Sequence, residues 1–164
     1  MNLLEKFRDI QTFIFDVDGV FTDGGLLIAE DGSLLRQMNV RDGYAVKHAL
    51  EAGYRICIIT GGNSAGVKSR LNKLGIEEVY SGIHDKISVY NKIVKAHQLD
   101  EGEILYMGDD VPDYEVMRRV GLPTCPNDAA TEINEVAYYI SPFKGGKGCV
   151  RDVIEKVMRL QEKW

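Results

Sequence analysis

The chain has 164 residues, of which 45% are hydrophobic and 27% charged, so it has the size and composition of one globular domain. Its net charge of −5 comes without a block of basic residues, which argues against nucleic acid as a partner. No apolar run approaches the roughly 18 residues of a membrane span, the first residues lack a signal-peptide layout, and three distant cysteines suit neither a disulfide framework nor a zinc site. We therefore expect a cytoplasmic protein without membrane contact.

Short apolar runs alternate with helical patterns along the first half of the chain. In chain order, they predict a strand over 12–15, a hairpin over about 25–39, a helix over 42–52, a strand over 55–60, a helix over 64–74 and a strand at 79–80. Asp31-Gly32 is a strong hairpin-turn signal between two apolar stretches. Asp42 is interpreted as the cap of the helix that follows it.

The same alternation continues to the end of the chain. It predicts a helix over 85–97, a strand over 104–107, a helix over 111–120, strands over 122–125 and 138–140, and a helix over 150–161. Strands that alternate with helices of about ten residues form parallel βαβ units. The predicted fold class is therefore α/β, a Rossmann-like three-layer α/β/α sandwich with a mostly parallel sheet, and we expect a single domain over residues 1–164.

Acidic residues gather after two of the predicted strands. Asp16 and Asp18 follow the first strand, and Asp109, Asp110 and Asp113 follow a later one. The carboxyl ends of parallel strands lie at one edge of a sheet, where ligands bind, so these acids are expected to meet. Their repulsion would cost several kcal/mol without a cation, and hard oxygen ligands suit Mg²⁺ that also holds a substrate phosphate. The alternative interpretation is that each aspartate only caps a helix or shapes a turn.

A phosphate site is predicted beside these acids. Thr60 ends a strand and is followed by Gly61 and Gly62, so a hydroxyl and exposed backbone N–H groups meet at a helix entry. Taken alone, this stretch also fits a plain turn. Lys86 lies in the first turn of a helix, where a cation opposes the helix dipole, and by itself it also fits a solvated surface lysine.

These stretches, in the order Asp-x-Asp-Gly, strand-Thr-Gly, Lys and Gly-Asp-Asp-x-x-Asp, resemble the haloacid dehalogenase superfamily over nearly the whole chain. The resemblance implies a phosphatase in which Asp16 is the nucleophile and Asp18 is first the general acid and then the general base. Thr60 and Lys86 are implied to hold the phosphoryl oxygens. An aspartate at the second position, rather than a threonine or an aliphatic residue, is typical of the phosphatases and mutases of the superfamily, and it supplies proton transfer.

The same resemblance implies a Mg²⁺ site. Its ligands are the carboxylate of Asp16, the backbone carbonyl of Asp18 and a carboxylate of Asp109, while Asp110 and Asp113 support that site. A cation there would neutralise the phosphoryl charge that an attacking aspartate must approach.

Members of the superfamily that the chain resembles usually insert a cap domain at one of two points, and here both points are almost empty. Residues 16–60 have room only for a hairpin, a helix and a strand, and residues 60–86 only for a helix and a short strand. The active site of a lone subunit is therefore expected to be open. Pairing the apolar hairpin with copies from other subunits would remove an unpaired sheet edge and help to exclude water. The alternative is that the hairpin packs back on its own domain.

A closer resemblance is to the capless 3-deoxy-D-manno-octulosonate 8-phosphate (KDO8P) phosphatases. It is carried by the stretches DVDGVFTDGG, NVRDGYAVK, TGG with VKSR, GIHDK and FKGGKG. It implies Mg²⁺-dependent hydrolysis of a phosphorylated 2-keto-3-deoxy sugar acid in lipopolysaccharide precursor synthesis, by a homotetramer assembled through the hairpin. Residues 143–148 are implied to form a mobile segment over a neighbouring subunit's site.

The resemblance also implies a set of substrate contacts: Asn39, Arg41, Asp42, Gly43, Lys47, Gly61, Gly62 and Arg70. Arg41 and Lys47 would neutralise the carboxylate of the sugar acid, because an arginine fork suits carboxylate geometry. Simpler interpretations remain, with Asp42 as a helix cap and Lys47 and Arg70 as solvated helix residues.

One position departs from the family pattern, because many members carry an arginine where this chain has Gly62. A nine-carbon nonulosonate 9-phosphate, of KDN or of an N-acylneuraminate, is therefore the alternative substrate. Two other classes stay open. One is an open-faced monomeric phosphatase for a macromolecule, and the other is a non-catalytic regulatory domain of a sialic-acid pathway protein.

Overall fold

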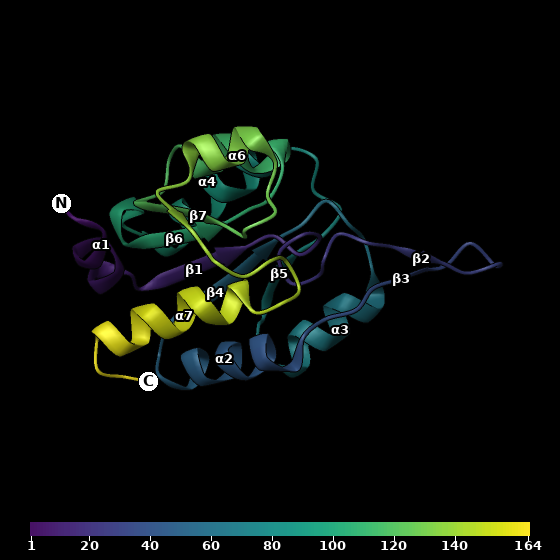
Figure 1. Cartoon of the computed structure of the whole chain (residues 1–164), viewed down its shortest axis with the longest axis horizontal. Helices are drawn as coiled ribbons and strands as arrows, with labels where there is room; N and C mark the ends of the chain where they lie inside the picture. The colour runs from purple at the N-terminus through teal and green to yellow at the C-terminus, as the bar shows by residue number, and fades with distance from the viewer.

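A six-stranded sheet forms the middle layer of the computed structural model, which describes residues 1–164 (Figure 1). Its strand order is β5-β4-β1-β6-β7-β8, and every neighbouring pair is parallel. The strands are β1 (Thr12–Phe15), β4 (Arg55–Ile59), β5 (Glu78–Tyr80), β6 (Ile104–Met107), β7 (Leu122–Cys125) and β8 (Tyr139–Ile140). The expected α/β sandwich with a parallel sheet is therefore confirmed.

Helices cover both faces of this sheet. One face carries α1 (Leu3–Asp9), α2 (Val40–Glu51), α3 (Ala65–Lys73) and α7 (Cys149–Leu160). The other face carries α4 (Lys86–His97), α5 (Tyr114–Met117) and α6 (Thr131–Val136). Figure 1 shows α2 and α7 below the sheet and α4 and α6 above it. No helix combines the length and the hydropathy that a membrane crossing requires.

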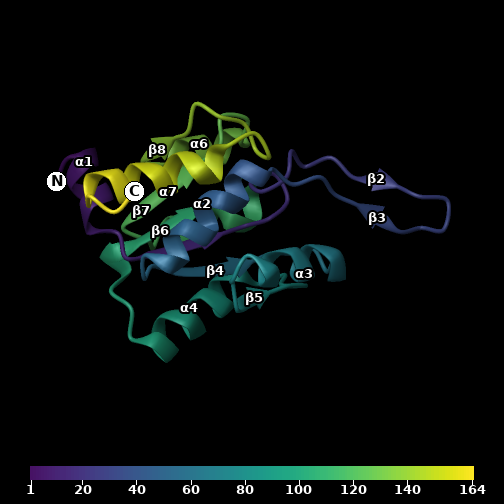
Figure 2. The ribbon, with the colours of Figure 1, turned by 90° about the horizontal axis from the view of Figure 1, so that it is seen from below.

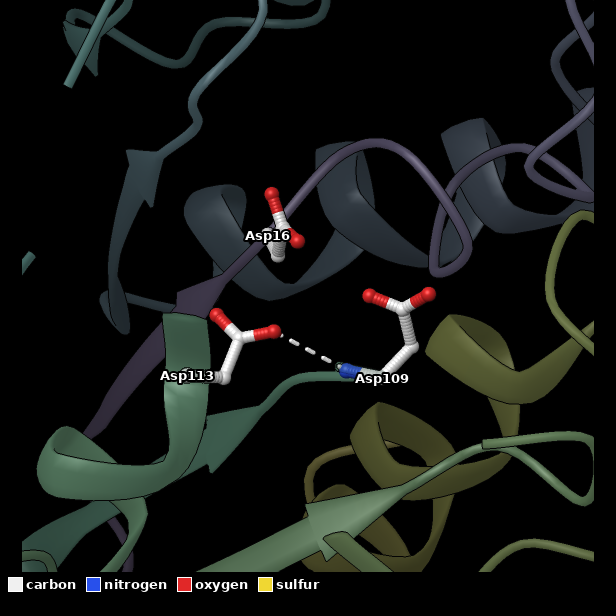
Figure 3. A group of neighbouring side chains, drawn as sticks. All are labelled: Asp16, Asp109 and Asp113. Carbon is white, nitrogen blue, oxygen red and sulfur yellow. Dashed lines mark hydrogen bonds between the residues drawn. The ribbon is translucent and has the colours of Figure 1, made fainter. Parts of the chain in front are cut away.

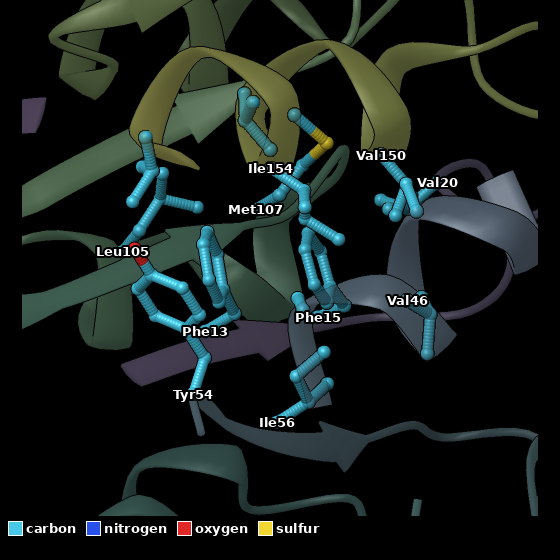
Figure 4. Packing of buried hydrophobic residues seen from close by; sticks show 14 of the residues in the cluster. Phe13, Phe15, Val20, Val46, Tyr54, Ile56, Leu105, Met107, Val150 and Ile154 are labelled. Carbon is cyan, nitrogen blue, oxygen red and sulfur yellow. The ribbon is translucent and has the colours of Figure 1, made fainter. Parts of the chain in front are cut away.

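The central strand β1 contributes side chains to both layers of the core. All four of its residues are buried, as expected for a parallel strand that is covered on both faces. Phe13 and Phe15 point into the layer under α2 and α7, where they pack with α7 residues such as Ile154 (Figure 4). Ile14 points into the opposite layer, under α4 and α5. The alternation of side chains along a strand therefore divides β1 between the two layers.

The helices depart from the predictions at α2, at the segment 111–120 and at α1 and α6. The side chain of Asn39 caps α2, so the prediction that Asp42 caps this helix was wrong. The helix expected over 111–120 is a 3₁₀ turn (Val111–Asp113) followed by the single turn of α5. Two helices, α1 and α6, were not predicted, although Asn2 and Glu5 form a capping box that marks the start of α1. A second 3₁₀ turn (Glu101–Glu103) precedes β6.

The predicted hairpin is present and projects away from the domain. Its strands are β2 (Leu27–Ile28) and β3 (Leu34–Leu35), which pair antiparallel around a turn with Gly32 at φ +86°. Figure 2 shows both strands extending beyond the helices. Leu27 and Ile28 are each 69% exposed, so the alternative that the hairpin packs on its own domain is wrong for the single chain.

Candidate active site

The sequence-predicted residues meet where three central strands end. Asp16 follows β1, Thr60 follows β4 and Asp109 lies two residues beyond β6. The chain runs outward from β1 to β4 and β5 and then returns to β6 on the other side, so β1 lies at a topological switch point. A hollow of about 400 Å³ opens there, lined by Asp16, Asp18, Gly24, Gly61, Gly62, Ile83, His84, Lys86, Asp109, Asp110, Pro112 and Asp113.

Three carboxyl groups converge at the floor of this hollow (Figure 3). Oxygen atoms of Asp16, Asp109 and Asp113 all lie within 4.8 Å of one another. Burial and the neighbouring charge of Asp113 raise the pKa of Asp16 well above its usual value, and the same causes raise the pKa of Asp109 to about 7. A divalent cation would relieve this repulsion, and hard carboxylate oxygens fit Mg²⁺. The donor set therefore suits a metal ion held by Asp16 and Asp109.

Lys86 supplies a positive charge beside the same acids. Its Nζ donates to Asp113 Oδ1 at 2.8 Å and lies 3.1 Å from Asp16 Oδ2, and the whole side chain is buried. Burial by itself would lower the pKa of Lys86, but attraction to Asp113 and Asp16 leaves it above its usual value. The lysine is therefore a fixed cation next to Asp16.

Asp113 forms hydrogen bonds with Lys86, Tyr106 and the loop that carries Asp109 and Asp110. Besides Lys86, its Oδ1 accepts a hydrogen bond from the Tyr106 hydroxyl at 2.5 Å, and its Oδ2 accepts from the backbone N–H groups of Asp109 and Asp110 at 3.0 and 3.4 Å. Asp113 is completely buried. Sequence reasoning missed Tyr106, whose only signal is a hydroxyl in an otherwise apolar strand.

The loop after β1 is shaped to bring its acids over the sheet edge. Gly19 has φ +82°, and a Cβ there would collide with the carboxylate of Asp109. The Thr22 hydroxyl oxygen accepts hydrogen bonds from the N–H groups of Gly19 and Gly24, both at 3.2 Å. The glycines after Asp-x-Asp therefore let β1 and β6 place their carboxylates together.

Asp18 has a partner that sequence reasoning did not name. Arg36 Nε donates to Asp18 Oδ1 at 2.7 Å, and its Nη2 donates to Oδ2 at 3.3 Å. Arg36 lies directly after β3, at the foot of the hairpin. A lone arginine next to apolar hairpin residues was the signal in the sequence, although nothing there indicated its partner.

Thr60 and the two glycines form one wall of the hollow. Thr60 is buried, and its hydroxyl oxygen accepts a hydrogen bond from the Gly62 N–H at 3.3 Å. A Cβ on Gly62 would lie 3.0 Å from Asp18 Oδ2 and 3.1 Å from Arg36 Nη2. Position 62 is therefore crowded by the Asp18–Arg36 pair.

The predicted substrate residues of α2 and α3 lie outside this hollow. The side chains of Arg41, Lys47 and Arg70 are exposed. Asn39 and Arg41 instead line a separate hollow of about 1050 Å³ between the start of α2 and α7. Gly43 lies where α2 contacts α3, and a Cβ there would lie 3.3 Å from Leu74 Cδ2 and 2.7 Å from the exposed end of Arg70.

Asp42 is buried in the contact between α2 and α7 and does not line the hollow. Its Oδ1 accepts from the Arg151 N–H at 2.9 Å, and its Oδ2 has no partner. Burial raises the pKa of Asp42 to about 6. The carboxyl group serves the start of α7 and not the hollow.

The glycine-rich segment over 143–148 packs on its own chain. The Gly146 N–H donates to the Val20 carbonyl at 2.9 Å, and a Cβ on Gly145 would collide with the Gly19 carbonyl. Asn39 Nδ2 also donates to the Gly146 carbonyl at 3.3 Å. In the single chain, this segment therefore supports the loop that carries Asp16 and Asp18.

Known proteins resemble this chain in sequence and in fold. The chain matches no family model. It is 34% identical over 162 residues to the 3-deoxy-D-manno-octulosonate 8-phosphate phosphatase KdsC of Yersinia pestis, covering 99% of this chain and 87% of the relative. The crystal structure of the Yersinia pestis phosphatase superposes with a TM-score of 0.95 at 34% identity, over 98% of this chain and 87% of the other.

A second solved structure carries ligands. It is the 3-deoxy-D-manno-octulosonate 8-phosphate phosphatase of Moraxella catarrhalis, in complex with a magnesium ion, a phosphate ion and a KDO molecule. It superposes with a TM-score of 0.93 at 30% identity, over 97% of this chain and 91% of the other. The similarity therefore extends along the whole chain and is not confined to short motifs.

Proposed function

The chain belongs to the 3-deoxy-D-manno-octulosonate 8-phosphate phosphatase family of the haloacid dehalogenase superfamily, and from this premise we propose that it is a Mg²⁺-dependent phosphatase that converts KDO8P to KDO and phosphate. One observation carries the proposal. Asp16, Asp109 and Asp113 converge with Lys86 at the switch point of a sheet that superposes, over 97% of the chain, on a relative solved with magnesium, phosphate and KDO.

The proposed reaction has two steps. An oxygen of Asp16 attacks phosphorus, the bond from phosphorus to the sugar oxygen breaks, and Asp18 gives its proton to that oxygen. Asp18 then takes a proton from water, which attacks phosphorus and releases phosphate from Asp16. Lys86 and Thr60 hold the phosphoryl oxygens throughout.

Mg²⁺ held by carboxylates of Asp16 and Asp109 and by the backbone carbonyl of Asp18 would neutralise charge on the phosphoryl group. Asp113 keeps Lys86 and the Asp109 loop in place, as its hydrogen bonds indicate. Asp110, whose side chain accepts from the Val111 N–H at 2.8 Å, shapes the same turn.

The substrate is tested by a kcat/KM panel of phosphorylated eight- and nine-carbon 2-keto sugar acids with Mg²⁺. We expect the eight-carbon KDO8P to have the largest value. A larger value for a nine-carbon acid would contradict the proposal, and that alternative is not favoured by relatives named for the eight-carbon substrate. The complete set of Asp16, Asp18, Lys86 and Asp109 also disfavours a non-catalytic regulatory domain.

Recognition of the keto-acid carboxylate is assigned to the exposed cations of α2 and α3. Arg41 offers a fork that matches a carboxylate, and Lys47 and Arg70 add positive charge. Replacing Arg41 by alanine should raise KM for keto-acid phosphates much more than for 4-nitrophenyl phosphate. Equal effects on both substrates would show that Arg41 does not bind the carboxylate.

We also propose a homotetramer assembled through the hairpin. Support comes from the apolar side chains that the hairpin exposes in the single chain: Leu26, Leu27, Ile28, Leu34 and Leu35. Such an edge is a liability unless other copies cover it. The expected mass in solution is four times the 18.4 kDa of one chain. Replacing Ile28 by aspartate should reduce this mass, whereas Glu30→Ala at the turn should not. A wild-type protein that stays monomeric would contradict the proposal.

The place of the reaction in the cell is a further part of the proposal. We place it in the cytoplasm, where it supplies the free sugar acid for lipopolysaccharide precursors. Cells without the enzyme should accumulate the phosphorylated sugar acid, and an unchanged level would contradict this placement.

A further inference from the structure

Arg36 ties the exposed hairpin to the catalytic acid Asp18. The residues of β2 and β3 are exposed, yet the side chain of Arg36, directly after β3, is only 9% exposed. It is buried because it packs beside Thr60 and Gly62 and forms an ion pair with Asp18. The foot of the hairpin thus ends in a contact with the active site.

The two hydrogen bonds of this pair are unequal. Arg36 Nε holds Asp18 Oδ1 at 2.7 Å, which is a short charge-assisted bond, whereas Nη2 lies 3.3 Å from Oδ2. The weakly held Oδ2 faces the phosphate cradle, since a Cβ on Gly62 would lie 3.0 Å from Oδ2 and 3.7 Å from Thr60 Oγ1. The absence of a side chain at position 62 leaves this side of Asp18 open.

From this geometry we infer that Arg36 is a positioning residue for proton transfer: it anchors Asp18 through Oδ1 and directs Oδ2 to the substrate. The inference rests on the proposed function, in which Asp18 is the acid and then the base. Oδ2 gives its proton to the sugar oxygen as the phosphorus–oxygen bond breaks, and it later accepts a proton from the attacking water. Arg36 keeps its own protons in both steps, because a guanidinium does not deprotonate in proteins.

The hairpin therefore does more than expose apolar residues. Because Arg36 and β3 are adjacent in the chain, the position of the hairpin stem sets the orientation of the Asp18 carboxylate. In this way the hairpin supplies Arg36, which orients Asp18 in a site that has no cap domain.

The test compares two substrates whose leaving groups differ in their need for a proton. A sugar hydroxyl leaves poorly without a proton from Asp18, whereas 4-nitrophenol leaves readily without one. We would prepare Arg36→Ala, Arg36→Lys and the control Gln37→Ala, which alters the exposed neighbouring residue. The first-turnover rate of phosphoryl transfer from KDO8P and from 4-nitrophenyl phosphate is measured with Mg²⁺ for each variant, together with kcat and KM.

For Arg36→Ala, the first-turnover rate with KDO8P should fall about 10- to 100-fold, which is part of the 10²–10⁴-fold that proton transfer supplies. The rate with 4-nitrophenyl phosphate should change less than about threefold, and KM for KDO8P should stay within about twofold. Arg36→Lys should recover part of the loss, because lysine keeps the charge but cannot form the fork. Gln37→Ala should match the wild type.

Three results would overturn the inference. One is an unchanged KDO8P rate in Arg36→Ala. Another is an Arg36→Ala variant that loses the same factor with both substrates, which would indicate a general structural role. The third is a raised KM with unchanged kcat, which would make Arg36 a substrate-binding residue. A wild-type protein that is inactive on KDO8P would instead refute the proposed function itself, so the two failures are distinguishable.

Discussion

Two of the places in the molecule where carboxyl groups are buried differ in what surrounds those groups. At the sheet edge, Asp16, Asp109 and Asp113 share one hollow with the cation of Lys86. In the contact between α2 and α7, Asp42 is alone and its Oδ1 accepts from the backbone N–H of α7. Burial raises the pKa of a carboxyl group at both places, to about 7 for Asp109 and about 6 for Asp42.

The comparison teaches that burial and a raised pKa do not by themselves indicate a catalytic acid. The sheet edge is distinguished by several acids from separate strands, a buried lysine and a hollow that a substrate can enter. Asp42 has none of these neighbours, and its carboxyl group replaces the missing side-chain cap of α7. Four changes test this difference, from the largest expected effect to the smallest.

Replacing Asp16 by asparagine should have the largest effect. The amide cannot act as the nucleophile, so kcat for KDO8P should fall by at least about 10⁴-fold while the fold is retained. Asp100→Asn, at an exposed cap far from the hollow, is the matched control and should retain full activity. Appreciable turnover by purified Asp16→Asn would contradict the nucleophile assignment.

Mg²⁺ should stabilise the sheet edge strongly. At about 1,000 times its Kd, an ion that binds only the folded chain adds about 4 kcal/mol to the free energy of unfolding, which thermal melting with and without Mg²⁺ would detect. Asp109→Asn should lose most of this gain, because it removes one charge from the acid cluster. An identical gain in Asp109→Asn and wild type would show that the ion binds elsewhere.

Replacing Lys86 by methionine should lower kcat by about 10²–10³-fold, because it removes the cation beside Asp16 and the phosphoryl group. Lys92→Met, on the exposed side of the same helix, is the control. Steady-state rates would reveal the loss. A lysine that only neutralised Asp113 for stability would instead lower the melting temperature and leave kcat nearly unchanged.

Asp42 should affect stability alone. Its pKa in the folded chain is about 6, above the ordinary 3.8, so the folded state binds its proton more tightly than the unfolded state does. The contribution of Asp42 to the free energy of unfolding of the wild type should therefore decrease as the pH rises from about 4 to 6. The decrease should be at most about 3 kcal/mol, and the contribution should not change further above about pH 6. Urea unfolding at pH 4.5 and 7 measures this. The free energy of unfolding of Asp42→Asn, relative to that of the wild type, should be higher at pH 7 than at pH 4.5. If the two proteins differed by the same free energy at both pH values, the raised pKa of Asp42 would not be the cause of the difference.

Much of the fold followed from local patterns. The apolar runs of β1, β4 and β6 are long enough to identify buried strands, and the Asp31-Gly32 pair identifies the hairpin turn, since Gly32 adopts a positive φ. The short helix α6 has no side-chain cap, and this explains why the sequence did not indicate its start. Pro112 lies where a helix was expected to begin, and the chain forms a 3₁₀ turn there.

The sequence by itself determined where the acids of the sheet edge and Lys86 lie, because each is joined within a few residues to a strand end or a helix start. Only the tertiary structure decided the partners of these groups. Arg36 meets Asp18, Tyr106 meets Asp113, and Asp42 meets the start of α7, 109 residues away in the chain. Such contacts depend on how separate elements pack, and a spacing along one chain carries no record of them. The same limit explains why Asp42 was expected to cap α2, when packing encloses its carboxyl group between α2 and α7.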